Sequence, residues 1–288
     1  MRAHAKINLF LDVTGKRPDG YHDIVSVMQT IGLHDELLVG GHDSGAPGAF
    51  SFHADCPLLP PGDGNIVCRA AAMMVREYKI ARPFSIRLSK KIPVGAGLAG
   101  GSADCAAALV GINAFLGLGL PMDELLGMGR ALGADVPFCL LGGTRLAEGI
   151  GDRLAPLPAH PDCAIVVAHP RIAVSTGEAF GKLSDADFRK KKPRAREVAG
   201  ALARNDLTGV AVSLYNVFAE RASADFPVIG NLLGSLASLG ALGAAMSGTG
   251  SAVFGYFGDD GLAAAAAAAL SDVADTFLTR PAAGRKAQ

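Results

Sequence analysis

The chain has 288 residues, half of them hydrophobic, and it carries 27 basic and 27 acidic side chains. Because its formal net charge is zero, the composition argues against nucleic-acid binding, which usually requires a basic excess. The length suffices for one large domain or two ordinary ones. Small-molecule chemistry is therefore the default interpretation.

The five cysteines are odd in number and widely spaced, without a C-x-x-C pair. This usage predicts neither a disulfide framework nor a zinc site and favours a reducing cytoplasm. The N-terminal stretch does not read as a signal peptide, because Asp12 interrupts its apolar run. The uncharged stretch 105–122 is long enough for a membrane span, but Asn113 and Pro121 favour a buried helix followed by a turn. No membrane partner is expected.

The first predicted strand covers residues 5–13 and places Lys6 and Asn8 on one face. A Pro-Asp-Gly turn follows at residues 18–20. Asn65 is a plausible N-cap for the next helix. The expected strands are 24–33, 35–40, 51–59, 83–94 and 163–170, together with two that flank the glycine turn within 241–257. The expected helices are 66–78, 102–118, 122–133, 227–240 and 261–277, and residues 134–157 return through a short helix to strands.

Three prolines within residues 155–162 suggest a boundary near residues 155–160 between two domains, 1–155 and 156–288. The charge run 188–198 is typical of a solvated face. The last residues, 280–288, are expected to form a frayed tail.

The stretch IPVGAGLAGGSADCAAALVG, residues 92–111, contains G-x-G-x-x-G. A dinucleotide site also needs a second strand ending in an acid about twenty residues on, but here a second helical pattern follows. A Walker P-loop is excluded because no G-x-x-x-x-G-K-[ST] occurs. The remaining reading is a glycine loop before a helix N-terminus, which suits phosphates. Ser102 could add a hydroxyl to a phosphate or a metal ion, and a purely structural glycine turn stays open.

PVGAGLAGGSAD resembles the phosphate loop of the GHMP kinases, which include galacto-, homoserine and mevalonate kinases. The opening AKINLFLDV with DGYHD, and then GNIVCRAA, LGADVPFCL, AEGIGDRL, VVAHPRIAVST and AMSGTGSAVF, follow in the order found in one branch of that superfamily. That branch phosphorylates a cytidyl diphosphate alcohol in isoprenoid precursor synthesis. The resemblance spans about residues 3–257. It implies a two-domain α+β GHMP kinase fold, with a mixed or antiparallel sheet and helices in the N-terminal domain and an α+β sandwich in the C-terminal domain.

Two residues of the loop depart from the family pattern. Ala99 stands where the family usually has glycine, and Ala96 occupies another glycine-tolerant position. Both side chains are small, so the loop should still approach phosphate. A left-handed backbone at Ala99 would cost free energy.

The resemblance implies that Asp135 is the base that accepts the proton of the substrate hydroxyl. From the residues alone, a helix N-cap is an equal alternative. Lys6 is implied as the partner of Asp135, where its cation would also contact the transferring phosphoryl group. Asn8, on the same face, is implied to bind the substrate or to hold this pair.

The resemblance also implies a cytosine site, in which Tyr21 stacks on the base and His22 reads its polar edge. Phe180 is implied as the second stacking face, with Thr176 nearby. Core packing is the alternative role for Phe180.

ATP is the implied co-substrate, Mg²⁺ the implied metal, and Asn65 is expected near the adenosine. Gly248 and Gly250 form a second glycine turn that is expected to pack beside the first loop. The implied ATP loop consists of Pro93, Val94, Gly95, Ala96, Gly97, Leu98, Ala99, Gly100, Gly101, Ser102 and Ala103.

Two other functions stay open at this point. One is a GHMP kinase for a different small alcohol, and the other is a nucleotide-binding regulator that has lost catalysis. Retention of both Lys6 and Asp135 argues against the regulator. No obligate protein partner is inferred.

Overall fold

The computed structural model describes residues 1–41, 46–184, 187 and 194–284, which form two compact units. The first unit comprises Met1–Ala5, His34–Val94 and Ala99–Leu141, and the second comprises Lys6–Leu33, Gly95–Leu98 and Gly142–Gln288. The long strands β1 (Arg2–Lys16) and β2 (His22–Gly41) contribute residues to both. Neither unit is continuous in sequence, so the division at residue 155 stays a prediction about the family's domains.

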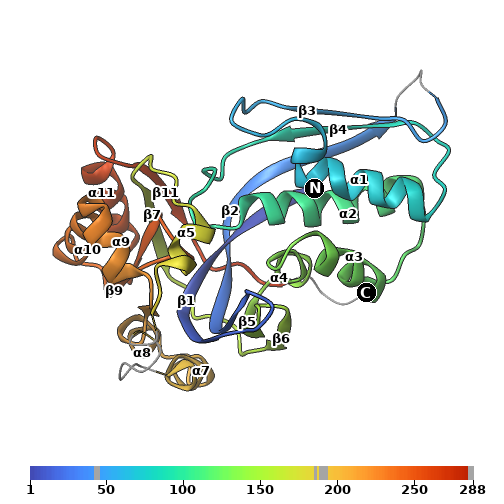
Figure 1. The fold of residues 1–288 in the computed structure, drawn as a ribbon. Coiled ribbons are helices and arrows are strands. Elements are labelled where there is room, and N and C mark those ends of the chain that lie inside the picture. The colour runs from blue at the N-terminus through green and yellow to red at the C-terminus, as the bar shows by residue number, and fades with distance from the viewer. Residues whose placement is uncertain (42–45, 185–186, 188–193, 285–288) are drawn as a thin grey trace. The chain divides into compact units, whose positions relative to one another are not determined.

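The first unit carries short strands and four helices around one core. Its elements are β3 (Phe50–Ala54), the 3₁₀ turn η1 (Gly62–Gly64), α1 (Ile66–Glu77), β4 (Phe84–Ser89), α2 (Gly100–Leu116), α3 (Met122–Leu132) and α4 (Val136–Leu141). Strand β4 pairs antiparallel with the end of β2 and parallel with β3. Helices α1 and α2 lie side by side (Figure 1).

Local sequence explains both of these helices. Asn65 caps α1 as predicted, because its Oδ1 accepts a hydrogen bond of 2.9 Å from the Val67 N–H. Helix α2 is rich in alanine and mostly buried, so alanine's helix propensity and small volume let its neighbours pack closely. The core of this unit includes the fully buried side chains of Met74, Phe84 and Leu109.

The second unit is built on a four-stranded antiparallel sheet with the order β11-β7-β10-β9. Within the same unit, β5 pairs antiparallel with β2 and β6, and β8 pairs parallel with β1. The strands are β5 (Thr144–Gly149), β6 (Arg153–Pro156), β7 (Ala164–His169), β8 (Tyr215–Asn216), β9 (Gly243–Met246), β10 (Val253–Phe257) and β11 (Asp275–Thr279). The helices are α5 (Thr176–Gly181), α7 (Ala195–Ala203), α8 (Leu207–Val212), α9 (Ala219–Asp225), α10 (Pro227–Ser238) and α11 (Asp260–Leu270).

Strands β7 and β10 are buried along their whole length. Helices α10 and α11 pack on this sheet (Figure 1). Their starts follow standard signals, with Pro227 in the first turn of α10 and the Asp259 side chain accepting the Leu262 N–H at the start of α11. The core includes Val166, Leu236 and Phe257.

The structure confirms most of the predicted elements. The strand predicted at 51–59 ends at Ala54, and the one predicted at 83–94 ends at Ser89. Three other predictions need larger corrections. The strands predicted at 24–33 and 35–40 are one continuous strand, β2, which pairs with β5 early and with β4 late. The helix predicted over 261–277 ends at Leu270, because residues 275–279 form β11 against β7. The tail is not frayed throughout, because Pro281 bridges to Ile31 and the Ala282 N–H bonds to the Thr30 carbonyl over 2.8 Å.

The sequence also left segments without any assignment. Residues 182–230, which carried no recognisable motif, contain α7, α8, β8 and α9. Of the charge run 188–198, residues 188–193 lie outside the described residues. The remainder leads into α7.

Candidate active site

Lys6 and Asn8 form a buried polar pair on β1 in the second unit. Their exposed fractions are 4% and 1%. Nζ of Lys6 donates to Oδ1 of Asn8 over 2.6 Å, and Nδ2 of Asn8 donates to Oγ of Ser26 over 2.8 Å. An ammonium carries three N–H donors, and a buried charge is costly unless it is paired. Lys6 is therefore suited to bind an anionic group.

The pair is hydrogen-bonded to both glycine segments of this unit, Gly95–Leu98 and the turn that contains Gly248 and Gly250. The Lys6 backbone N–H donates to the Leu98 carbonyl over 3.1 Å, at the end of the first segment. The Gly248 N–H donates to Oδ1 of Asn8 over 2.9 Å, in the second glycine turn. The lysine thus has a fixed place relative to two backbone turns.

The two glycine segments pack directly against each other, as predicted. Gly97 has a φ of +75°, and a β-carbon there would lie 2.1 Å from the Ser247 carbonyl oxygen. Ser247 Oγ donates to the Gly97 carbonyl over 2.9 Å. The Ala252 N–H donates to the Ala96 carbonyl over 3.1 Å. Both the close approach and the positive φ require glycine at position 97.

Asn216, which the sequence analysis did not single out, holds the second glycine turn. Nδ2 of Asn216 donates to the carbonyls of Met246 and Gly248, over 2.7 and 2.8 Å. The hydroxyls of Thr176 and Thr249 lie 3.2 Å apart, so Thr176 links α5 to this turn. No motif marks Asn216, and only its burial in the structure reveals the role.

The start of α2, in the first unit, has the features of an anion site. Ala99 precedes the helix in the left-handed region, with a φ of 57°, and no side chain caps the helix. Gly100, Gly101 and Ser102 form its first turn. The N–H groups of a first turn have no intrahelical acceptors, and the helix dipole favours negative charge there. The predicted phosphate site therefore has the backbone that it needs.

A buried ion cluster lies beneath this turn. A β-carbon on Gly100 would lie 3.2 Å from Nζ of Lys90. That ammonium contacts Oδ2 of Asp35 at 2.5 Å and Oδ2 of Asp104 at 2.8 Å. Oδ1 of Asp35 also accepts the N–H groups of Lys91 and Ile92. The cluster joins the end of β4 to β2 and α2, and sequence reasoning missed it.

The charges of this cluster are unequal, because one lysine faces two carboxylates. Burial raises the pKa of Asp104 to about 8, and Oδ1 of Asp104 has no partner among the described residues. Burial alone would lower the pKa of Lys90, but the carboxylates of Asp104 and Asp35 outweigh it and raise that pKa. Asp104 is thus the group that holds a proton at neutral pH.

Asp135 lies between Gly133 and the start of α4, where its side chain is half-buried. Its carbonyl accepts the Cys139 N–H over 3.1 Å, so Asp135 occupies the N-cap position of α4. Within its own unit, however, the described residues offer its carboxylate no hydrogen bond. Pro137, in the first turn of α4, has no N–H to offer. Ile66 lies 3.4 Å from a β-carbon placed on Gly133 and 3.8 Å from one on Gly101. The first unit therefore gathers Asp135, the start of α1 and the phosphate turn.

The residues implied to read a cytosine lie in the second unit. Tyr21 is 61% exposed. The His22 and Phe180 rings are 5.2 Å apart and tilted by 38°, and Phe180 lies edge-on to Phe218 at 4.8 Å. Burial, with a smaller effect from Lys16, lowers the pKa of His22. Phe180 therefore contacts a predicted site residue and the core together, and its stacking partnership with Tyr21 stays a prediction.

The remaining sequence predictions fall at the ends of these segments. The predicted ATP loop is divided between the units. Pro93 and Val94 are the last residues of His34–Val94 in the first unit, and Gly95 is the first residue of Gly95–Leu98 in the second unit. Asn65 is buried at the start of α1, and the residue after it, Ile66, lies 3.8 Å from a β-carbon placed on Gly101. Lys6 and Asp135 belong to different units, so their pairing stays a prediction.

The described part of the chain has no helix long and apolar enough to cross a membrane. It also has no group of three or more His, Cys, Asp or Glu side chains placed to bind a metal ion by themselves.

Family models and individual relatives match the chain over most of its length. The model of the GHMP kinase N-terminal domain matches residues 65–143, and that of the C-terminal domain matches residues 198–276. A 4-diphosphocytidyl-2-C-methyl-D-erythritol kinase of Acetivibrio thermocellus is 40% identical over 236 residues, which cover 82% of each chain. The chain belongs to the 4-diphosphocytidyl-2-C-methyl-D-erythritol kinase family of GHMP kinases.

Solved structures agree with this membership. A crystal structure of 4-(cytidine 5'-diphospho)-2C-methyl-D-erythritol kinase superposes with a TM-score of 0.84, at 33% identity over 99% of both chains. A homoserine kinase from Cytophaga hutchinsonii superposes with a TM-score of 0.72 at 20% identity, over 100% of this chain and 97% of its own, and shares the fold. The predicted two-domain α+β GHMP kinase fold is confirmed. As a member of a kinase family, the chain takes ATP as its co-substrate.

Proposed function

We propose that the chain transfers the γ-phosphoryl group of ATP to the 2-hydroxyl of 4-diphosphocytidyl-2-C-methyl-D-erythritol. The reaction belongs to the non-mevalonate route to isoprenoid precursors and takes place in the cytoplasm. The observation that carries the proposal is the structural likeness to the kinase of that substrate over 99% of both chains. The buried Lys6–Asn8 pair supports it, because a fixed cation beside two glycine turns suits phosphoryl transfer.

In this proposal Asp135 accepts the proton of the 2-hydroxyl as the oxygen attacks the γ-phosphorus. The transferred group carries negative charge in the transition state, so a fixed cation stabilises it. Lys6 supplies that cation and pairs with Asp135. Asn8 holds the lysine through the 2.6 Å hydrogen bond.

The first turn of α2 binds the phosphates of ATP through the N–H groups of residues 100–102, and Asn65 lies near the adenosine. In kinases, phosphates and waters supply most Mg²⁺ ligands and the protein few, which is consistent with the lack of a protein-only metal cluster among the described residues. Ser102 would add its hydroxyl. When bound, the ion neutralises charge on the phosphates.

The cytosine lies between Tyr21 and Phe180, and His22 reads its polar edge. The lowered pKa of His22 favours the neutral ring, which offers one donor and one acceptor. One nitrogen of that ring, together with the His22 backbone, can then read the polar edge of the base. Thr176 orients the same region through α5.

An acceptor panel tests the proposal. Purified protein is incubated with labelled ATP and, in turn, the cytidyl diphosphate alcohol, homoserine, mevalonate and galactose. Labelled product should form only with the cytidyl substrate. Turnover of another alcohol would assign a different GHMP kinase activity. ATP binding without turnover of any acceptor would indicate the regulator.

A further inference from the structure

The β1–β2 hairpin turn, which carries Tyr21, is closed by main-chain hydrogen bonds. The Arg17 N–H donates to the Tyr21 carbonyl over 2.8 Å, and the Gly20 N–H donates to the Arg17 carbonyl over 3.1 Å. Gly20 has a φ of +87°. This is a three-residue hairpin loop with glycine at the left-handed position, formed by the Pro-Asp-Gly sequence itself.

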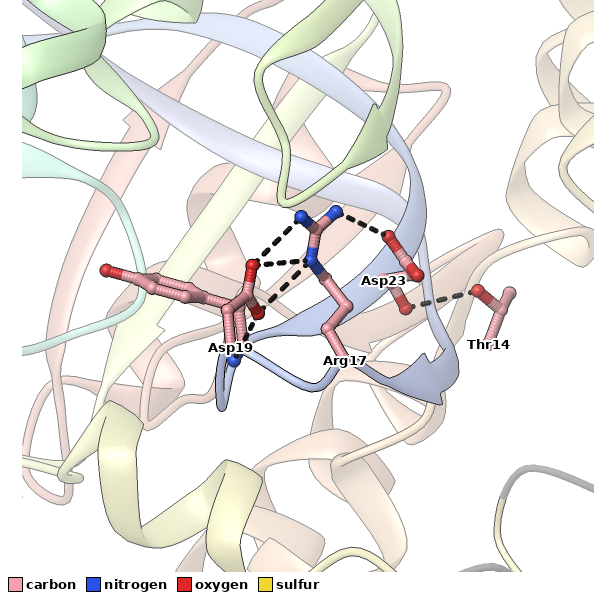
Figure 2. A network of polar contacts seen from close by, with 5 residues as sticks. Thr14, Arg17, Asp19 and Asp23 are labelled. Carbon is pink, nitrogen blue, oxygen red and sulfur yellow. Dashed lines mark hydrogen bonds and ion pairs between the residues drawn. The ribbon is translucent and has the colours of Figure 1, made fainter.

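A network of side chains is added to this turn (Figure 2). The Arg17 guanidinium donates to both oxygens of Asp19 over 2.9 to 3.2 Å, and to Oδ1 of Asp23 over 3.3 Å. Oδ1 of Asp19 also accepts the Tyr21 N–H over 3.1 Å. Oγ1 of Thr14 donates to the Asp23 carbonyl over 3.2 Å. One arginine therefore bridges the residues on both sides of the Tyr21–His22 pair.

The network contributes little to the stability of the fold. The side chains of Arg17, Asp19 and Asp23 are 39%, 49% and 46% exposed. Ion pairs at such exposure add little to folding free energy. The hydrogen bond from Arg17 lowers the pKa of Asp19, which favours the charged form of this carboxylate. Arg17 nevertheless donates to three carboxylate oxygens, and a role other than stability accounts better for this arrangement.

What the network adds is a restraint on the backbone of Tyr21. Its ring is largely exposed, so neighbouring side chains do little to orient it. The Asp19 carboxylate accepts the Tyr21 N–H, and the Arg17 guanidinium holds that carboxylate in place. The Tyr21 carbonyl is held by the main-chain N–H of Arg17, which a side-chain substitution leaves intact. His22 follows directly and faces Phe180 at 5.2 Å. An aromatic group held in its binding orientation loses less conformational entropy when a ligand stacks on it.

We propose that Arg17 and Asp19 are positioning residues for the cytosine site, which hold the backbone of Tyr21 so that its ring and His22 meet the base together. This inference rests on the proposed function. It assigns no contact between Arg17 and the substrate.

The test is the Arg17→Gln variant, measured with both substrates. KM for the cytidyl diphosphate alcohol should rise roughly 2- to 13-fold, the effect of having to order one side chain on binding. KM for ATP and kcat should stay near their wild-type values. Arg17→Lys should recover only part of the loss, because an ammonium is a point donor and cannot bridge Asp19 and Asp23 as a guanidinium fork does.

Arg280→Gln is the matched control. Arg280 is an exposed arginine of the same unit, 45% accessible, that pairs with Asp162 and Asp260. The Arg280→Gln substitution should change neither Michaelis constant, and it should shift the melting temperature as little as Arg17→Gln does. Equal changes of KM in both variants would contradict a positioning role.

Asp19→Ala separates positioning from direct binding of the substrate's phosphates by Arg17. Positioning predicts that Asp19→Ala raises KM for the cytidyl substrate. It also predicts that the double variant, Arg17→Gln with Asp19→Ala, has a KM no higher than that of the weaker-binding single variant, because both residues act through Tyr21. Direct binding predicts an unchanged or lower KM, since Asp19→Ala frees the guanidinium. An unchanged or lower KM in Asp19→Ala, or a wild-type KM in Arg17→Gln, would overturn this inference. The proposed function would stand in either case, provided that the wild type phosphorylates the cytidyl substrate. No turnover by the wild type would overturn the proposed function and this inference together.

Discussion

The ammonium of Lys90 lies 2.8 Å from Oδ2 of the buried Asp104 carboxyl group, beneath the first turn of α2. Asp35 contacts the same ammonium, and burial raises the pKa of Asp104 to about 8. The negative charge of Asp104 is thus withheld from the place where ATP phosphates are proposed to bind.

This raised pKa predicts the pH dependence of stability. Between the ordinary value near 4 and about 8, the folded state binds the Asp104 proton and the unfolded state does not. The free energy of unfolding should therefore fall as pH rises through this window, by at most about 1.4 kcal/mol per pH unit. Asp104→Asn should lose this slope in urea unfolding, whereas Asp123→Asn, at the exposed start of α3, should keep it. A wild-type slope in Asp104→Asn would contradict the assignment.

The protein should be less stable with alanine than with glycine at position 99. Its left-handed φ of 57° costs an L-residue roughly 1–2 kcal/mol, and glycine's greater freedom when unfolded returns part of that. Ala99→Gly should raise the free energy of unfolding by up to about 1 kcal/mol. The matched variant Ala103→Gly, inside α2, should lower it by about 1 kcal/mol. Equal destabilisation by both variants, measured in urea, would show that Ala99 is not left-handed.

Asp135→Asn should abolish most of the turnover. The amide keeps the shape of the side chain but cannot accept a proton, so kcat should fall roughly 10²- to 10⁴-fold. KM for ATP should change little. Asp123→Asn, a carboxylate of the same unit at the start of α3, serves as the control and should stay active. Near-normal turnover by Asp135→Asn would remove this residue from the mechanism.

Tyr21→Ala and His22→Ala should act on one substrate only. Loss of a stacking face costs roughly 1–3 kcal/mol, so Tyr21→Ala should raise KM for the cytidyl substrate about 5- to 150-fold. His22→Ala should weaken discrimination against the uracil analogue, because a buried polar reader rejects a mismatched edge. ATP's KM is the internal control. If both variants bind the cytidyl substrate normally, these residues belong to an ordinary surface turn.

Local patterns predicted the parts of the fold that depend on neighbours in sequence. The two-residue spacing of Lys6 and Asn8 placed both on one face of β1, and Asn65 caps α1 as expected. Gly97 was recognisable as part of a tight loop because glycine adopts positive φ without steric cost.

Long-range contacts could not be predicted in the same way. Lys90 reaches Asp35, 55 residues away in the sequence, and nothing near either residue signals the other. Asn216 holds the second glycine turn from a segment without a motif. The strand at residues 275–279 was taken for helix, because the alanine tract before it has high helix propensity and only pairing with β7 reveals the strand.

Phosphorus NMR of the product tests the central claim most directly. The 2-carbon of the proposed substrate bears a methyl group, so its hydroxyl is tertiary and no hydrogen lies three bonds from a phosphorus attached there. The account predicts a new phosphomonoester resonance, formed from ATP and the cytidyl substrate, that shows no splitting by protons. A resonance split by neighbouring protons, or no new phosphomonoester at all, would contradict it.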